Sequence, residues 1–182
     1  MRRARAGEAP AFAELVRRHQ DAIYGLIVRM VGEAATAEEL TQDTFLRAWR
    51  KCASFRGDSR VSTWLYRIAV NLCRDHRDSR RARQGRLETS LDDPARGPLD
   101  LVAKGPRPDE LLQEREVARA FQRALEELDA DHRAAFLLRH QEGLGPAEIA
   151  AALGISEANA KVRVHRARRG ILATLRRLGH VI

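Results

Sequence analysis

Hydrophobic residues recur every three to four positions through the first half of the chain, and this spacing predicts three amphipathic helices. Pro10 suits the first turn of the first helix, and Gly32 suits its end. The second helix is expected to begin at Thr36, and the third has Ser62 or Thr63 as its N-cap. Each helix has one apolar face, so we expect each to pack on a core.

The helical pattern disappears after Arg86. Residues 87–108 contain four of the six prolines of the chain, which predicts an irregular, flexible linker with no core of its own. The sequence is therefore expected to form two small helical domains, residues 1–86 and residues 109–182, joined by this linker.

Helical spacing returns from about Asp109, and Asp129 or Asp131 is expected to cap a short helix. The next helix begins at Gly145-Pro146, and a turn at Gly154 leads into the last helix. Small and apolar residues surround this turn in the arrangement that a helix-turn-helix needs. The sequence thus predicts an all-α fold with a helix-turn-helix near its C-terminal end.

The last helix of this motif is strongly basic. Residues 161–177 contain seven lysines and arginines and no acidic residue. A basic helix also suits an anionic membrane, but the turn buries the apolar face that a membrane would contact. We therefore expect DNA binding by the outer face and its flanks, which carry Lys161, Val162, Arg163, His165, Arg166, Arg168 and Arg169.

A second candidate nucleic-acid surface lies along one side of the third predicted helix. Trp64, Arg67, Asn71, Arg74 and Asp78 share one stripe on the side away from the apolar face. An indole, an amide and two guanidiniums in one line suit base stacking, hydrogen bonding to a base edge and phosphate binding. The alternative is a solvated basic helix end with a half-buried Trp64, and the helical wheel by itself leaves both open.

The second predicted helix carries Leu46 and Trp49 on an otherwise polar face. Interfaces combine apolar anchors with a polar rim, so this pair suits a partner surface. Two isolated apolar residues on a surface are also ordinary. The pattern alone does not choose between these interpretations.

The formal net charge of +8 favours a polyanionic partner, either nucleic acid or an anionic membrane. The charge is unevenly spread, because residues 87–131 hold twelve acidic and six basic residues. The positive excess lies on either side of this acidic stretch, which predicts two separate nucleic-acid contacts.

Cys52 and Cys73 are the only cysteines, and their spacing indicates neither a metal site nor a disulfide framework. No stretch approaches the roughly 20 apolar residues of a transmembrane helix. We therefore expect a soluble, cytoplasmic protein with no metal, no cofactor and no membrane insertion.

The stretch FRGDSRVSTWLYRIAVNLCRDHR, residues 55–77, resembles the second conserved region of bacterial RNA polymerase sigma factors of the sigma-70 family. The resemblance is to the small extracytoplasmic-function (ECF) group. It implies that this helix and the loop before it open the promoter −10 element and capture an extruded non-template base, with Asn71 lining the base pocket. The −10 DNA-binding residues that it implies are Phe55, Arg56, Ser59, Arg60, Trp64, Arg67, Asn71, Arg74 and Arg77.

Two further stretches resemble the same family. AEELTQDTFLRAWR, residues 37–50, is similar to the surface that binds the clamp helices of the polymerase β′ subunit. The core polymerase interface implied there consists of Glu39, Gln42, Asp43, Leu46 and Arg50. LRHQEGLGPAEIAAALGISEANAKVRVHRARRGIL, residues 138–172, resembles the fourth region, which reads the −35 element in the major groove. The family further implies contact with the polymerase β flap and control by an anti-sigma factor.

We therefore predict an alternative sigma factor of the ECF type, with a region 2 helical bundle and a region 4 helix-turn-helix. It is a specificity subunit and not an enzyme: Asp75-His76 and Asp131-His132 are adjacent pairs that point about 100° apart on a helix and form no dyad. The alternative is a stand-alone helix-turn-helix transcriptional regulator. That interpretation explains residues 132–178 but gives no role to Trp64, Asn71 or the face of Gln42.

Overall fold

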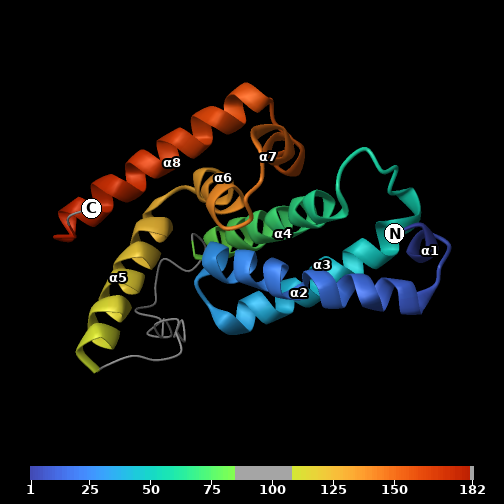
Figure 1. Cartoon of the computed structure of the whole chain (residues 1–182), viewed down its shortest axis with the longest axis horizontal. Coiled ribbons are helices and arrows are strands. Elements are labelled where there is room, and N and C mark those ends of the chain that lie inside the picture. Colours follow the sequence, from blue (N-terminus) through green and yellow to red (C-terminus); the bar gives the residue numbers. More distant parts are fainter. Residues whose placement is uncertain (85–107, 181–182) are drawn as a thin grey trace.

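The computed structural model describes residues 1–84 and 108–180, and every regular element in these ranges is helical (Figure 1). This confirms the predicted all-α class. The elements are α1 (Arg2–Arg5), α2 (Ala9–Val31), α3 (Ala34–Lys51), the 3-10 helix η1 (Cys52–Ser54), α4 (Val61–Gln84), α5 (Pro108–Glu127), α6 (Ala130–His140), α7 (Pro146–Leu153) and α8 (Glu157–Arg177).

Helices α2, α3 and α4 pack together in the N-terminal half, residues 1–84. The long helix α2 ends where the sequence predicts, at Gly32, whose φ of 79° is left-handed and accessible to glycine without strain. The backbone N–H of Gly32 donates to the carbonyl of Val28 at 2.8 Å. The predicted inner face of α3, including Leu40 and Phe45, is buried.

The predicted start of α4 is too late by two or three residues, because the expected cap was Ser62 or Thr63. The helix begins at Val61, because the carbonyl of Arg60 already accepts the first helical hydrogen bond, from the N–H of Trp64 at 3.1 Å. Ser62 and Thr63 therefore lie inside the first turn and cap nothing. Thr63 is only 2% exposed, so packing of this turn against the core outweighs the local capping preference.

The predicted start of α3 at Thr36 is also too late. The helix begins at Ala34, after the extended residue Glu33. The hydroxyl of Thr36 donates to the carboxylate of Glu33 at 2.8 Å instead of accepting from the backbone. A local side-chain partner thus replaces the capping box.

Asp129 and not Asp131 caps α6. Its Oδ1 accepts from the backbone N–H groups of Asp131 and His132, both at 3.0 Å. The cap satisfies two N–H groups that have no partner within the helix. The carboxylate of Asp131 therefore remains available to other residues.

Helices α7 and α8 form the predicted helix-turn-helix. Glu148 accepts from the N–H of Gly145 at 2.9 Å before α7, and Gly154, with a φ of 68°, ends that helix. Ser156 then caps α8 by accepting from the N–H of Asn159 at 3.2 Å. These local contacts set the angle at which α8 leaves the turn.

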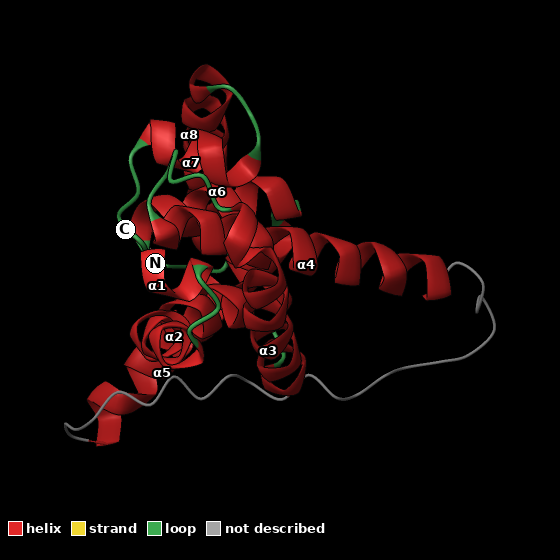
Figure 2. Ribbon diagram, turned by 90° about the vertical axis from the view of Figure 1, so that its right-hand side faces the viewer, coloured by secondary structure: helices red, strands yellow, loops and turns green. Residues whose placement is uncertain are grey.

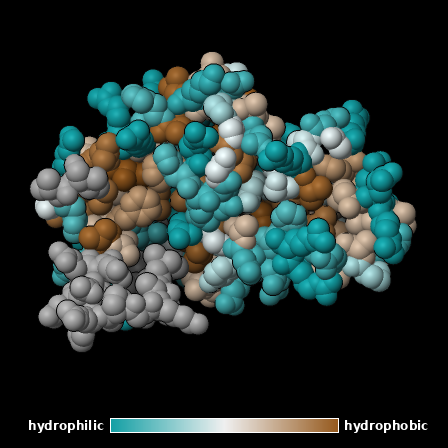
Figure 3. Space-filling model, in the orientation of Figure 1, coloured by the Kyte–Doolittle hydropathy of each residue, from teal (hydrophilic) through white to brown (hydrophobic). Residues whose placement is uncertain are grey.

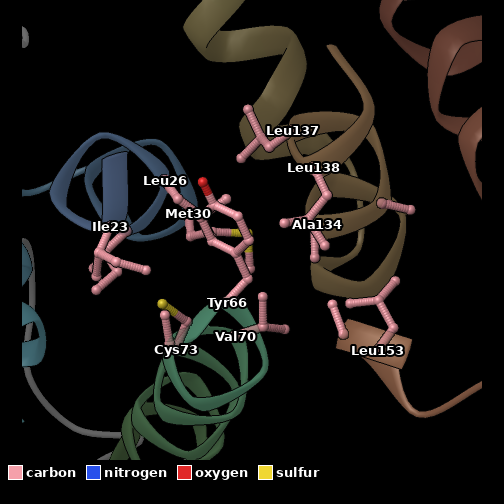
Figure 4. Close-up of a cluster of buried hydrophobic side chains, with 14 of the residues drawn as sticks. Ile23, Leu26, Met30, Tyr66, Val70, Cys73, Ala134, Leu137, Leu138 and Leu153 are labelled. Atoms are coloured by element: carbon pink, nitrogen blue, oxygen red, sulfur yellow. The ribbon is translucent and has the colours of Figure 1, made fainter. Parts of the chain in front are cut away.

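The C-terminal half, residues 108–180, packs against the N-terminal half. Helices α6 and α7 lie against α2 and α4, and buried side chains from both halves form one hydrophobic cluster (Figure 4). Members of the cluster include Leu26 and Met30 of α2, Val70 of α4, Leu137 and Leu138 of α6, and Leu153 of α7.

The predicted linker lies outside the described residues, except for its last residue. Pro108 is the first residue of α5, a position at which proline loses no helical hydrogen bond. Among the described helices, none combines enough length with enough apolar character to cross a membrane.

Candidate nucleic-acid interface

Of the stripe predicted on α4, Arg67, Asn71 and Asp78 are exposed, and Trp64 and Arg74 are partly covered. Arg77, which the family resemblance adds to the −10 set, is also partly covered. Asn71 accepts a long hydrogen bond from Arg74, with 3.4 Å between Nη1 and Oδ1. Because this bond runs along the helix to the next turn, the amide of Asn71 remains open to solvent and is not engaged with the loop before α4.

An aromatic pair stands at the start of this stripe. The rings of Phe55 and Trp64 lie 5.1 Å apart between centroids and are tilted by 53°. Phe55 is buried, whereas Trp64 is partly exposed. Phe55 thus supports the indole from behind, and of the two rings Trp64 is the one that a base can reach.

The loop between Phe55 and Val61 carries the remaining residues predicted for the −10 site. Gly57 has a φ of 87°, which turns the loop in the left-handed region that favours glycine. Arg56 is exposed and Ser59 is partly buried. Arg60 reaches α7, where its Nη1 lies 3.3 Å from Oε1 of Glu148.

Beyond this stripe, the C-terminal part of α4 projects from the body of the molecule (Figure 2). Arg81 and Arg83 are exposed there. Because these two arginines are exposed, the surface of α4 continues as a solvated basic segment.

Figure 3, in the orientation of Figure 1, shows hydrophilic residues over much of another face of the molecule, with hydrophobic residues between them.

The recognition helix α8 presents most of its predicted residues to solvent. The exposed ones are Lys161, Val162, His165, Arg166, Arg168 and Arg169. Nζ of Lys161 lies 2.8 Å from Oε1 of Glu157 within the same helix. The opposite face, which includes Ala160, Ala167 and Ile171, is buried as predicted. This division matches a helix that has one face on its own domain and the other free for the DNA major groove.

Arg163 is arranged differently from the rest of the predicted −35 set. Its Nη1 donates to Oδ2 of Asp131 at 2.7 Å, and its Nε donates to Oδ1 of Asn159 at 3.2 Å. The side chain is 20% exposed. In this structure Arg163 therefore serves the packing of α8 on α6.

The predicted partner face of α3 is exposed at Leu46, whose exposed fraction is 53%. Glu39, Gln42 and Arg50 are also exposed, and Asp43 is partly buried. Helix α3 thus combines an uncovered apolar side chain with a polar rim, which is the composition expected of a protein-binding surface.

Sequence reasoning missed the acidic residues that connect the two halves. Oδ1 of Asp131 on α6 lies 2.7 Å from Nη2 of Arg74 on α4. Glu148 on α7 pairs with Arg60 in the loop before α4. Glu142, between α6 and α7, accepts a hydrogen bond from the hydroxyl of Tyr66 on α4. The acidic stretch of residues 87–131 was the available signal for Asp131. Its significance was hidden, because no sequence pattern shows that α6 lies against α4.

Two buried groups in this region have shifted pKa values. Burial, followed by the hydrogen bond to Glu142, raises the pKa of Tyr66. Burial raises the pKa of the Cys73 thiol to about 12. Cys52 and Cys73 are both buried free thiols, so neither is presented to solvent for reaction near neutral pH.

Family models match both halves of the chain. Residues 15–83 match sigma-70 region 2, and residues 118–170 match sigma-70 region 4. The first segment includes the loop before α4 and nearly all of α4, and the second includes α7, the turn and the first two thirds of α8.

Whole-chain similarity covers nearly the full length. The RNA polymerase sigma-H factor of Pseudomonas aeruginosa is 34% identical over 93% of this chain and 88% of its own. The ECF RNA polymerase sigma factor SigW of Bacillus subtilis is 32% identical over 98% of this chain and 96% of its own.

Two solved structures are similar in fold. The sigma factor RpoE of Bartonella quintana, in complex with the anti-sigma factor NepR, has a TM-score of 0.66 at 25% identity and covers 91% of this chain and 97% of its own. CnrH, in complex with the cytosolic domain of CnrY, has a TM-score of 0.67 at 26% identity, over 95% of this chain and 92% of its own. Since relatives of at least 30% identity match almost from end to end, the chain belongs to the extracytoplasmic-function subfamily of the bacterial sigma-70 family.

Proposed function

We propose that this protein directs core RNA polymerase to specific promoters, with its N-terminal half, residues 1–86, at the −10 element and its C-terminal half, residues 109–182, at the −35 element. The observation that carries the proposal is a pair of basic helices, α4 and α8, one in each half, each with an exposed polar face. A stand-alone helix-turn-helix regulator would need α8 alone. The proposed sigma factor binds promoter DNA and polymerase and does not catalyse a reaction. It acts in the cytoplasm, where promoters and polymerase are found.

The −10 surface consists of α4 and the loop before it. A base is readable on its Watson–Crick edge only after it leaves the duplex, and extrusion costs a few kcal/mol. Trp64 offsets part of that cost by stacking, at about 1–3 kcal/mol per base. Asn71, whose amide has both donors and an acceptor, discriminates between bases, while Arg56 and Arg67 hold phosphates.

The −35 surface is the exposed face of α8. Arg166, Arg168 and Arg169 contact phosphates and base edges in the major groove. Val162, an exposed apolar residue among these charges, suits contact with a thymine methyl group. Arg163 reaches this surface only after it leaves Asp131.

The polymerase surface is the exposed face of α3. Leu46 enters an apolar site on the β′ clamp helices, and Glu39, Gln42, Asp43 and Arg50 form the polar rim. The region 4 half contacts the β flap. An anti-sigma factor is a further partner, supported by the similar structure of the sigma factor RpoE of Bartonella quintana, which was solved in complex with the anti-sigma factor NepR.

Transcription in vitro tests the proposal. The purified protein is added to bacterial core polymerase on a library of promoter fragments, and the start sites and footprints are mapped. We expect transcripts from a defined set of promoters, with protection at both elements only when core polymerase is present. Sequence-specific protection by the protein alone, without transcription, would favour the stand-alone regulator.

A further inference from the structure

The short helix α1 lies beside the segment that leads into the proposed −10 site. It contacts η1, the 3-10 helix that ends immediately before Phe55. The thiol of Cys52 in η1 donates to the carbonyl of Ala4 in α1, with 3.4 Å between Sγ and O, and Ala4 has no exposed surface. Figure 1 shows α1 at the same end of the molecule as the loop before α4. Helix α1 is therefore attached to the base of that loop.

The side chains of α1 other than Ala4 are all arginines, and all of them are exposed. Arg3 is occupied, because its Nη2 lies 2.7 Å from Oε2 of Glu8. Among the residues that the structure describes, no carboxylate pairs with Arg2 or Arg5. These two are three positions apart, so they share one face of the helix, where like charges repel. A polyanion bound over this face would remove the repulsion.

The surface next to α1 is also basic. Lys51 precedes η1 and Arg56 follows it by two residues, and both are exposed. Residues 1–7 contain three basic residues and no acidic one, and the same is true of residues 50–57. Helix α1 thus extends the positive charge of the proposed −10 surface past the loop, at the end of α4 opposite to its basic C-terminal part.

Helix α1 is held in place in the free protein. The backbone N–H groups of Gly7 and Glu8 donate to the carbonyls of Ala4 at 3.1 Å and Arg3 at 3.2 Å, which closes the turn after the helix. Met1 packs against the hydrophobic core. Because the backbone of α1 is already ordered, its arginines bind a ligand without the cost of ordering a free segment.

We propose that α1 is a further DNA contact, at which Arg2 and Arg5 bind backbone phosphates of the strand that the loop before α4 captures. The inference rests on the proposed function. A guanidinium suits this role because it forms paired hydrogen bonds with phosphate oxygens. Phosphate contacts carry no sequence information, so α1 adds affinity and fixes the position of the strand without adding base preference.

An acidic surface of core polymerase is the other candidate partner, because Arg50 of the proposed polymerase face is also close to η1 in sequence. Continuity favours DNA, since the bond between Ala4 and Cys52 joins α1 to the loop that captures the strand. Composition favours DNA as well. Protein-binding surfaces combine charges with apolar anchors, and the described residues 1–8 include no large, exposed apolar side chain.

Each phosphate contact leaves a signature in the salt dependence of binding. Loss of one contact lowers the slope of log affinity against log salt by about 0.7 on a single strand and by about 0.9 on a duplex. Between about 50 and 200 mM salt, this slope corresponds to roughly threefold in affinity. The affinity ratio between wild type and a variant that lacks one contact should therefore shrink about threefold over that range.

The test uses the full chain assembled with core polymerase, on promoter DNA that is already mismatched across the −10 element. Arg2→Ala, Arg5→Ala and the double variant are compared with Arg17→Ala, a matched control on α2 whose exposed guanidinium pairs with Glu14. We expect each α1 variant to lose affinity equally on all sequences, with a slope reduced by about 0.7, and the double variant to lose about twice as much. The control should keep the wild-type slope, and thermal melting confirms that each variant is folded.

Neutral methylphosphonates, placed at one position of the non-template strand at a time, locate the contact. Where Arg5 binds, neutralising the phosphate should weaken the wild type but not Arg5→Ala, because the interaction is already absent from that variant. A role of α1 in only supporting the loop would not produce this result, since the loss would then depend on no particular phosphate.

Affinities and salt slopes equal to those of Arg17→Ala would overturn the proposal, as would a wild-type response of both single variants to every neutral phosphate. Weaker binding of the variants to core polymerase in the absence of DNA would overturn it in favour of a polymerase contact. Failure of the wild type to direct promoter-specific transcription would contradict the proposed function itself. An active wild type whose α1 variants behave like the control contradicts only this inference.

Discussion

The indole of Trp49 packs edge-on against the ring of Phe12, with centroids 4.9 Å apart and planes at 64°. This contact fixes Trp49 beside Leu46, one turn away on the same face of α3. The indole is partly used by the core, whereas Leu46 has no such cover. Of the two apolar residues on this face, Leu46 is therefore the better anchor for a partner, and Trp49 supports it.

Replacing Leu46 by glutamate should abolish binding to core polymerase without unfolding the protein. An unpaired carboxylate buried in an interface costs several kcal/mol, whereas an exposed substitution changes the free energy of unfolding by about 0.5 kcal/mol or less. Core affinity is measured by a competition assay and stability by thermal melting. The control is Ala13→Glu on the exposed face of α2. Wild-type core affinity in the folded Leu46 variant would contradict the assignment of this face.

Asn71→Ala should slow open-complex formation on duplex promoter DNA and flatten the preference at one non-template position. The amide is exposed and makes only a long contact with Arg74, so the melting temperature should change little. Kinetics of open-complex formation on single-base promoter variants measure both effects.

A template that is already mismatched across the −10 element provides the control for this variant. The rate defect should shrink there because the cost of unpairing is removed, while the loss of base preference should persist. A lower melting temperature with no base-dependent effect on the mismatched template would mean that Asn71 is only structural.

Arg166→Ala should weaken binding of the holoenzyme to all upstream sequences or relax the preference at one base pair. Removing a phosphate contact from α8 reduces the salt dependence by about one unit, whereas removing a base contact costs roughly 1–3 kcal/mol at one position. Affinity is measured at several salt concentrations and on single-base variants. Arg176→Ala, exposed near the other end of α8, is the control. Equal effects of the two substitutions would place the DNA elsewhere.

Glu127 on α5 binds two residues of α8, and this contact should make the free energy of unfolding depend on pH in the acid range. Thr174 donates to its Oε2 at 2.6 Å and Arg177 binds Oε1, and these contacts lower the pKa of the carboxyl below its ordinary 4.5. A lowered folded-state pKa stabilises the protein above the unfolded value, and this stability is lost as the pH falls through the folded pKa. Glu127→Gln should therefore be less stable than wild type near neutral pH, with a difference that shrinks below about pH 4.5.

Chemical denaturation at a series of pH values measures this difference. Glu116→Gln, which changes an exposed carboxylate on the same helix, is the control. A pH-independent difference between wild type and Glu127→Gln would show that the carboxylate charge is not what joins α5 to α8.

Local chemistry made much of the fold predictable. Gly32 and Gly154 end their helices in left-handed geometry, and Ser156 caps α8, because each depends only on neighbouring residues. Burial along α3 and α8 also follows from helical periodicity. The cap expected at Ser62 or Thr63 was wrong because Arg60 already provides the first helical acceptor, and the buried first turn sets the start of α4.

The sequence by itself determined the helices, their apolar faces, the basic character of α4 and α8, and the family, because these depend on spacing of a few residues or on matching motifs. Only the tertiary structure decided that Asp131 meets Arg74 and Arg163, since the contact joins residues far apart in the chain. The contact of Trp49 with Phe12, which leaves Leu46 the more exposed of the two, was likewise decided by packing. Helical periodicity states which face of each helix is buried but not which helix covers it, and the charge pairs across a boundary depend on that choice.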